Sequence, residues 1–237
     1  KPYLVRTVVR GYKQVAHYHP VCSYLDALPQ WDGHDHIGDL FRRITHDEQL
    51  LLWLRRWLLG MVAQVQGRLG RYGNSVCPLI ISRQQGWGKS QFAKLIVPPE
   101  LQMFFADTFN LAQEGTCLRR MASYWLINVD ELDRFSTLRM ATLKNLVQLA
   151  TITLKRPHRG QMEEMERMAS FIATSNRRYL LNDETGSRRF ICVELTHAID
   201  VDTPLDYEQL YAEAMAALAA GDELHVPVAL FKDATAA

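Results

Sequence analysis

Apolar residues in the first third of the chain recur at helical spacing between polar residues and turn formers. The longest periodic run covers residues 47–69 and places a stripe of large side chains on one helical face, which predicts a helix packed against a core. The stripe consists of Trp53, Leu54, Trp57, Leu58 and Met61. Shorter helices are predicted over residues 20–28 and 38–44, and the pattern breaks between Gly70 and Asn74.

From Val76 onward, short apolar runs alternate with helical patterns. The runs predict strands over residues 76–82, 103–106, 124–129, 170–174 and 190–195. Helices are predicted over residues 89–96, 138–149 and 206–220, the last of them ended by Gly221. Strands that alternate with helices predict an α/β fold, in which helices cover both faces of a parallel sheet.

The change of pattern divides the chain into a helical subdomain over residues 1–72, an α/β core over 73–200 and a C-terminal helical segment over 201–237. With 48% hydrophobic residues, the 237-residue chain can bury a sizeable core. The apolar run over residues 50–65 is too short and too charged to span a bilayer. We expect a cytoplasmic protein, in a bacterium or a phage-infected bacterial cell. The start at Lys1, without an initiator Met, suits a fragment of a larger protein.

Charge and metal-ligating residues exclude several classes of function. The 27 basic and 26 acidic residues give a net charge of +1, so a contact with nucleic acid has to come from a local patch. The cysteines form no CxxC pair, which argues against a zinc site and favours reduced thiols. They are Cys22, Cys77, Cys117 and Cys192. We interpret His17, His19, His34 and His36 as surface or helix-capping residues, because their spacing fits no common metal site.

A phosphate-binding loop is predicted between the strand that ends near Ser82 and the helix that begins at Lys89. Backbone N–H groups at such a junction form a concave anion site, and glycines let the chain approach phosphate closely. The predicted ATP-binding residues are Gln85, Gly86, Trp87, Gly88, Lys89 and Ser90. Lys89 would reach the β- and γ-phosphates of ATP, and Ser90 would hold Mg²⁺. The complete motif has a glycine where this chain has Arg83. The alternative is a helix N-terminus with a chance lysine.

An apolar strand that ends in Asp130 and Glu131 follows 41 residues downstream. Hydrolysis of ATP needs one carboxylate beside Mg²⁺ and a second that polarises the attacking water. We assign Asp130 to the metal and Glu131 to the role of catalytic base. The alternative is an acidic pair on the surface.

Two further catalytic assignments follow along the chain. Asn176 ends the strand predicted over residues 170–174, and its amide could orient water against the γ-phosphate; the alternative is an ordinary turn residue. Arg188 and Arg189 precede the last strand. An arginine placed across a subunit boundary can neutralise charge in the transition state. The sequence does not choose between the two arginines, and the alternative is a basic surface turn.

Taken in order, these residues resemble the virulence-associated-protein-E family, which belongs with superfamily-three-like helicases of the AAA+ class in phages and mobile elements. The resemblance rests on His19-Pro20, Tyr24-Leu25, Trp31-Asp32-Gly33, Gln85-Gly86, Gly88-Lys89-Ser90, Glu131-Leu132, Thr174, Asn176, Gly186, Arg188-Arg189-Phe190 and Glu208 to Ala214. It implies an ATPase that assembles as a ring, expected to be a hexamer, around DNA, often behind a primase domain. Arg83 departs from the family pattern, and so does Asn128, where the family is expected to carry an extra acid.

The family resemblance also implies a hairpin between Glu131 and Asn176 that points into the channel of the ring. The segment over residues 151–160 has alternating β-formers followed by a basic turn. Lys155, Arg156 and Arg159 are therefore predicted to contact the phosphates of DNA. The alternative is a solvated basic loop.

Three functions fit these motifs to different degrees. The first is an ATP-dependent DNA helicase or translocase. The second is a nucleotide switch that binds ATP, turns over slowly and recruits a partner, which the arginine at position 83 keeps open. The third is a small-molecule kinase, and the Asp130-Glu131 pair together with the late arginines argues against it.

Overall fold

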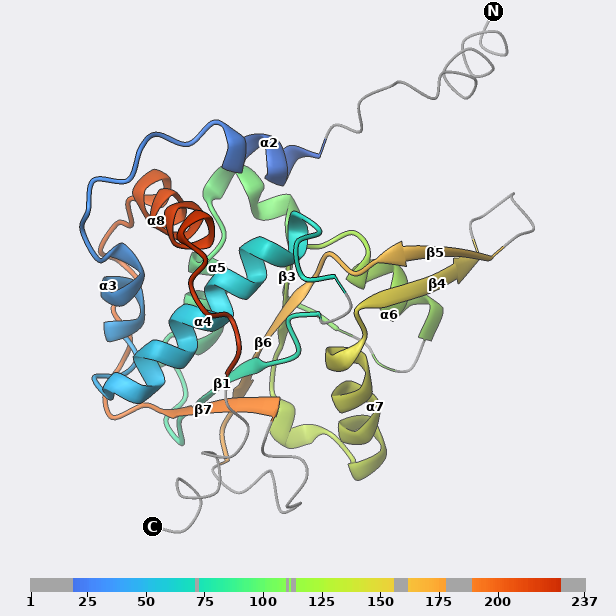
Figure 1. Cartoon of the computed structure of the whole chain (residues 1–237). Coiled ribbons are helices and arrows are strands. Elements are labelled where there is room, and N and C mark those ends of the chain that lie inside the picture. The colour runs from blue at the N-terminus through green and yellow to red at the C-terminus, as the bar shows by residue number, and fades with distance from the viewer. Residues whose placement is uncertain are drawn as a thin grey trace, which may run out of the picture.

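A parallel five-stranded sheet lies at the centre of the protein, as a computed structural model shows (Figure 1). The structure describes residues 19–70, 73–109, 111, 114–155, 162–177 and 189–226. The strands are β1 (Cys77–Ile81), β2 (Phe105–Ala106), β3 (Leu126–Val129), β6 (Ser170–Ser175) and β7 (Phe190–Glu194). Their order across the sheet is β2-β3-β6-β1-β7, and every pair is parallel. The predicted α/β fold with a parallel sheet is confirmed.

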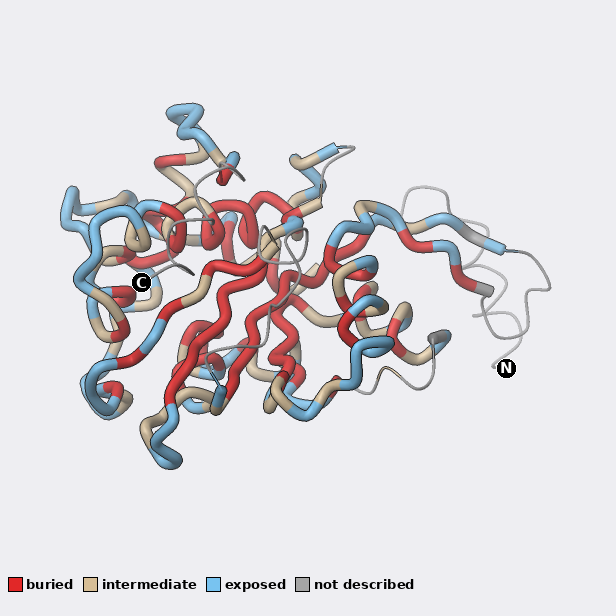
Figure 2. The backbone as a smooth tube through the Cα atoms, turned by 90° about the horizontal axis from the view of Figure 1, so that it is seen from below, coloured by how far each residue is buried: buried red, intermediate tan, exposed pale blue. Residues whose placement is uncertain are grey.

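Helices cover both faces of the sheet. Side chains of a strand point alternately to its two faces, so Ile80 of β1 lies in one core while Leu79 and Ile81 lie in the other. Five helices pack on the Ile80 face: α2 (Pro20–Asp26), α3 (His36–Arg42), α4 (Glu48–Val65), α5 (Lys89–Leu95) and α8 (Tyr207–Ala220). Helices α6 (Glu114–Met121) and α7 (Thr137–Gln148) pack on the other face. Figure 2 shows the buried strands between these two layers.

The predicted long helix is α4, and its whole predicted stripe from Trp53 to Met61 is buried. Asp47 caps the helix, because its carboxylate accepts hydrogen bonds from two backbone N–H groups of the first turn. The helix ends at Val65, four residues before the predicted end. Gly67 follows with a φ of 66°, in the left-handed region that commonly terminates helices.

The long helix α4, before the sheet, and helix α8, after it, share one core with the sheet. Helices α4 and α8 contact each other, and residues of both belong to the core on the Ile80 face. Trp125, which precedes β3, donates from its indole Nε1 to the Met61 carbonyl at 3.2 Å, and its ring lies 5.1 Å from that of Tyr211. The division at residues 72 and 200 stays a prediction, and across both boundaries the packing is continuous.

An antiparallel hairpin projects from the sheet (Figure 1). It consists of β4 (Thr151–Lys155) and β5 (Met162–Glu166), paired from Thr151 with Glu166 to Lys155 with Met162. Its first arm lies where the sequence predicted one. The predicted turn over residues 157–160 lies outside the described residues. Within the described residues, two short 3₁₀ helices flank strands of the sheet, Pro99–Phe104 before β2 and Leu132–Arg134 after β3.

Candidate active site

The candidate site lies at the carboxyl ends of the parallel strands. Strand β1 lies between β6 and β7. After β1 the chain crosses to β2, the strand at one edge of the sheet, and it comes back to the neighbours of β1 only with β6 and β7. Ligands of open α/β sheets bind beside such a change of direction, where two neighbouring loops separate. A cavity of about 520 Å³ opens there, lined by the loop after β1 and by residues that follow β3 and β6.

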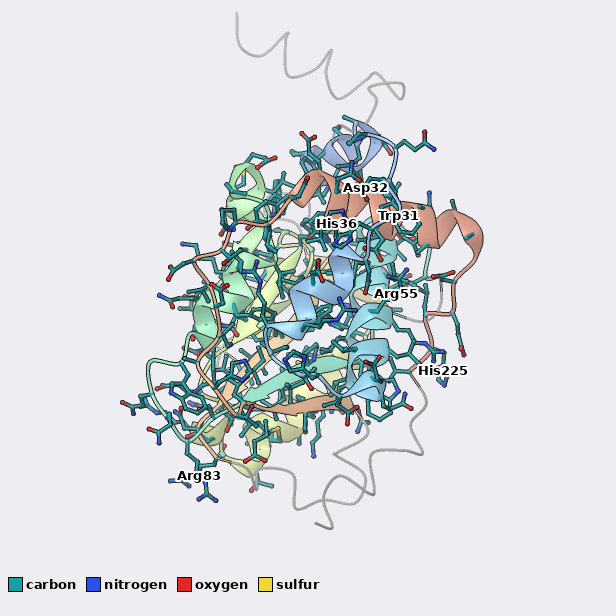
Figure 3. The ribbon with its side chains drawn as sticks, turned by 90° about the vertical axis from the view of Figure 1, so that its left-hand side faces the viewer. Trp31, Asp32, His36, Arg55, Arg83 and His225 are labelled. Atoms are coloured by element: carbon teal, nitrogen blue, oxygen red, sulfur yellow. The ribbon has the colours of Figure 1, made fainter. Side chains whose placement is uncertain are left out.

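The loop after β1 has the backbone that its glycines predict. Gly86 and Gly88 have φ values of 79° and 82°, which side-chain-bearing residues rarely adopt. A Cβ at Gly86 would meet no atom within 4 Å, whereas one at Gly88 would lie 3.2 Å from Cγ1 of Val201. Arg83 is exposed, its φ is not positive, and its side chain points away from the molecule (Figure 3). The missing glycine therefore leaves no backbone strain at position 83.

Lys89 lines the cavity, and its ammonium has three hydrogen-bond partners. Its Nζ donates hydrogen bonds to the carbonyls of Ser82 at 3.2 Å and Gln84 at 3.4 Å, and to Oδ1 of Asn176 at 3.0 Å. Partial burial lowers the pKa of Lys89 from its usual value, because removal from water disfavours the ammonium. The lysine thus joins the end of β1 to the end of β6.

Ser90, Asp130 and Thr174 form a chain of side-chain contacts across three strand ends. The Ser90 hydroxyl donates to Oδ1 of Asp130 at 3.0 Å. The Thr174 hydroxyl donates to the same carboxylate oxygen and accepts from the backbone N–H of Glu131 at 3.2 Å. The structure therefore brings together the predicted residues Lys89, Ser90, Asp130 and Asn176.

Glu131 also lies in the cavity lining, and its side chain has a partner there. Its carboxylate pairs with the Arg134 guanidinium, with Oε2 and Nη1 2.6 Å apart. Both side chains are well exposed to solvent, so the ion pair is only weakly stabilising. Arg134 was not a candidate in the sequence, although it stands three residues after Glu131 within a 3₁₀ turn.

Asp133 is a second residue that the sequence did not single out. Its Oδ1 accepts from the backbone N–H of Asn176 at 3.0 Å and from the Ser175 hydroxyl at 3.4 Å. It fixes the end of β6 against the turn that follows β3. Its only sequence signal is its position two residues after Glu131.

Asn128, where the family pattern is expected to have an acid, is fully buried in β3. Its Nδ2 donates to Oδ1 of Asp107 at 2.9 Å, which joins β3 to the end of the neighbouring strand β2. A carboxylate at position 128 would face the carboxylate of Asp107, whereas the amide can donate to it. This contact gives the departure a structural reason.

Arg189 lies at the amino end of β7, whereas the predicted phosphate-binding loop follows the carboxyl end of β1. It precedes β7, in which Phe190 pairs with Cys77 and Glu194 pairs with Ile81. Strands β1 and β7 therefore lie side by side from their amino ends to their carboxyl ends. Its Nη2 donates to Oε1 of Gln148 at 3.0 Å. It lines a second cavity, of about 640 Å³, together with Arg68 and His225, the latter labelled in Figure 3.

Four predicted residues cannot be placed by their side chains. Arg156, Arg159 and Arg188 lie outside the described residues, and Lys155 is described only as the last residue of β4. Their predicted roles stay predictions.

Histidines and cysteines supply no alternative site in the described part of the chain. His19 caps α2, while His34 and His36 hydrogen-bond to Asp39 and Asp32 on the surface. All four cysteines are free thiols. Among the described residues, no three His, Cys, Asp or Glu side chains group as metal ligands. No described helix combines the length and the apolar character needed to cross a bilayer.

Comparison with known sequences identifies the family of the chain. The virulence-associated protein E-like domain matches residues 25–236. The chain belongs to this family. The match of the virulence-associated protein E-like domain contains the phosphate-binding loop and the carboxylate pair. Among curated proteins, no sequence matches the chain.

Solved structures of the C-terminal region of NrS-1 share the fold of this virulence-associated protein E-like domain. All three are described as apo: two superpose with TM-scores of 0.57 and 0.58 at 17% sequence identity, and the third with 0.57 at 19%. Each alignment covers 91% of this chain and 53% of the other, so the chain spans about half the length of those structures. At this identity the similarity establishes the fold alone.

Proposed function

We propose that this domain binds ATP with Mg²⁺ at the carboxyl edge of the sheet, hydrolyses it, and drives movement along DNA as a ring of copies, expected to be a hexamer. One observation supports the proposal most directly: hydrogen bonds join Lys89 to Asn176 and Ser90 to Asp130 within a single cavity. These residues come from three separate strand ends, and chance surface residues would have no reason to converge.

The oxygen atoms of Ser90 and Asp130 suit Mg²⁺. They lie 3.0 Å apart. Adjacent oxygen ligands of an octahedral Mg²⁺, each about 2.1 Å from the metal, are about 3.0 Å from each other. A hydroxyl and a carboxylate are the hard oxygen ligands that this ion prefers, and bound Mg²⁺ would neutralise phosphate charge. The spacing therefore supports Ser90 and Asp130 as the metal-side residues.

Each of the remaining site residues would have a separate role in hydrolysis. Lys89, already partly desolvated, would exchange its carbonyl partners for phosphate oxygens. Glu131 would take the proton of the attacking water, which requires its carboxylate to separate from Arg134. Asn176, fixed by Asp133, would contact the γ-phosphate or the water. None of these steps requires the glycine that Arg83 replaces.

Contact with DNA is proposed at the tip of the β4–β5 hairpin. The exposed positions along its arms carry Thr151, Thr153, Glu164 and Glu166, which face each other in cross-strand pairs. Carboxylates repel phosphate, so the arms are poor sites for a nucleic acid backbone. The basic residues of the turn, Arg156 and Arg159, together with Lys155 are the attractive positions.

The decisive experiment compares wild type with Glu131→Gln in ATP hydrolysis and in strand displacement on forked DNA. We expect Glu131→Gln to bind ATP but to lose at least about 100-fold in hydrolysis and all unwinding, because its amide cannot accept the proton. Glu48→Gln, an exposed glutamate at the start of α4, is the matched control and should behave as wild type. Unwinding that survives Glu131→Gln would overturn the proposal.

A slow nucleotide switch remains the second candidate. The ion pair between Glu131 and Arg134 favours it, because a carboxylate engaged with a guanidinium is not free to accept the proton of a water molecule. Steady-state phosphate release with and without single-stranded DNA separates the two functions. DNA-stimulated turnover supports the motor, and slow turnover that DNA does not change supports the switch.

A further inference from the structure

Arg167, at the root of the β4–β5 hairpin, is among the largest fully buried side chains of the protein. Burial lowers its pKa to about 10, so the guanidinium still carries its charge at neutral pH. Its hydrogen-bond partners within the described residues are backbone carbonyls and one side-chain amide, with no carboxylate among them. A buried charge without a counter-ion is unfavourable, so its contacts need an explanation.

The guanidinium joins three parts of the fold. Its Nη1 donates to the carbonyls of Leu146 at 3.3 Å and Val147 at 2.6 Å, in the last turn of α7, where the helix dipole favours a cation. Its Nη2 donates to the Asn74 carbonyl at 2.8 Å and to Oε1 of Gln64 on α4 at 3.3 Å. Its Cζ also lies 5.6 Å from the ring centre of Phe171 on β6.

The residues that surround the Arg167 side chain leave space for it and hydrogen-bond to its backbone. A Cβ at Gly73 would lie 2.9 Å from Nη2 of Arg167 and 3.0 Å from the Leu149 carbonyl, so only glycine fits there without a shift. Gln64 receives the backbone N–H of Asn74 at 2.7 Å and donates to the Arg167 carbonyl. The arginine thus has a fitted pocket between α4, α7 and the segment that enters β1.

The path of the chain connects this pocket with the candidate active site. From Glu131 the chain runs through α7 into the hairpin, and from the hairpin it returns through β6 to Asn176. At the active-site end, Asp133 and Thr174 bond the two segments to each other. At the hairpin end, Arg167 bonds the end of α7 to the start of β6. Helix α7 and strand β6 are therefore fastened together at both ends.

We propose that Arg167 is the positioning residue that transmits changes between the nucleotide site and the hairpin, by holding the end of α7 to the start of β6. This inference rests on the proposed nucleotide binding. Movement of Glu131 or Asn176 on binding would shift α7 against β6, and the arginine converts that shift into a displacement of both hairpin arms. Arginine suits this position because its planar group donates to several acceptors at once, whereas a lysine ammonium can reach only one side.

Hydrogen exchange of the whole chain, with and without Mg²⁺ and a slowly hydrolysed ATP analogue, tests the inference. In the wild type, we expect the analogue to slow exchange in the loop over residues 83–90 and to change exchange in β4 and β5 by at least about fivefold. In Arg167→Met, the analogue should still slow hydrogen exchange in the loop but should leave hydrogen exchange in the hairpin unchanged. Arg139→Met, an exposed arginine on the same helix α7, should respond as wild type does.

Each outcome decides between the two proposals. A hairpin that still responds in Arg167→Met overturns the role of Arg167. A wild-type loop that responds while the hairpin does not also overturns it, but leaves nucleotide binding supported. If neither segment responds in the wild type, nucleotide binding fails and the role of Arg167 fails with it.

A second variant covers the case in which Arg167→Met does not fold, as shown by loss of a cooperative thermal transition. Arg167→Lys keeps the charge but can bond only α7 or the Asn74 side. It should keep the response of the loop and lose most of the response of the hairpin. A full wild-type response in Arg167→Lys contradicts the inference.

Discussion

At the scale of single residues, Glu131 is unusual because it has a positive φ, 51°, the only such value at a non-glycine residue in the described part of the chain. A left-handed conformation costs about 1–2 kcal/mol for a residue with a Cβ. Two hydrogen bonds hold it: its N–H donates to the Thr174 hydroxyl, and its carbonyl accepts from the Arg134 N–H at 2.9 Å. Strain of this kind concentrates at functional sites.

Thr174→Val should therefore impair the site without unfolding the protein. The valine keeps the shape of threonine but removes the acceptor for Glu131 and the donor for Asp130. We expect ATP hydrolysis to fall about tenfold, which corresponds to about 1.4 kcal/mol in the transition state. Thr142→Val, at a partly exposed position of α7, loses only a bond to the Leu138 carbonyl and is the control. Equal rates for wild type and Thr174→Val would show that this hydroxyl does not position Glu131.

At the scale of elements, the sequence predicted best where one face is apolar throughout. The strands β1, β3, β6 and β7 and the helices α4, α7 and α8 all lie within three residues of the predicted starts, because each buries a periodic stripe or a continuous apolar run. Helix α6 and strand β5 were missed. Strand β5 reads Met-Glu-Glu-Met-Glu, which has few β-formers, and it is a strand because it pairs with β4.

The residues of the candidate site also fall into those that the sequence predicted and those that it did not. Lys89, Ser90, Asp130 and Asn176 were predictable, since each stands at the end of an apolar strand or in a glycine loop that follows one. Arg134 and Asp133 were not, because they lie in a 3₁₀ turn whose direction the sequence does not specify. The partner of Asn128 was also hidden: Asp107 is far away in the sequence and meets it only when β2 pairs with β3.

Helix α4 should contribute strongly to stability through Trp57, which is fully buried between the N-terminal helices and the sheet. Trp57→Ala should reduce the free energy of unfolding by about 3–5 kcal/mol, from lost burial and the cavity left behind. Urea denaturation measures this change. Leu52→Ala, on the same helix with 42% of Leu52 exposed, should cost far less. Similar losses for the two variants would contradict the predicted role of Trp57.

At the scale of the whole molecule, the sheet separates two functional candidates. The predicted phosphate-binding loop lies at the carboxyl ends of the strands, and Arg189 lies at the amino end of β7, five residue steps away from Glu194, which pairs with Ile81. Five steps along a strand span about 16 Å, which exceeds the reach of an arginine side chain. Arg189 therefore cannot serve its own site. It could serve only the site of a neighbouring copy, arranged head to tail.

Arg189→Ala should keep ATP binding and lose about 10³-fold in hydrolysis if it acts across a subunit boundary. Mixing is the informative measurement. The Lys89→Ala variant has a defective loop but keeps Arg189. The Arg189→Ala variant has an intact loop but lacks the arginine. An equal mixture should recover hydrolysis at about a quarter of the interfaces, where an intact loop meets an intact arginine. A mixture as inactive as its components, with assembly intact, would exclude this role.

The root of the hairpin also has an evolutionary consequence. The N–H of Arg167 donates to the Ala150 carbonyl at 3.0 Å, so the segment between them leaves and re-enters the fold at almost one point. A segment whose ends meet can be lengthened, shortened or exchanged without displacing its neighbours. The arms can therefore change in length and charge during evolution while the sheet stays unchanged. The same point is where an engineer would graft a foreign arm.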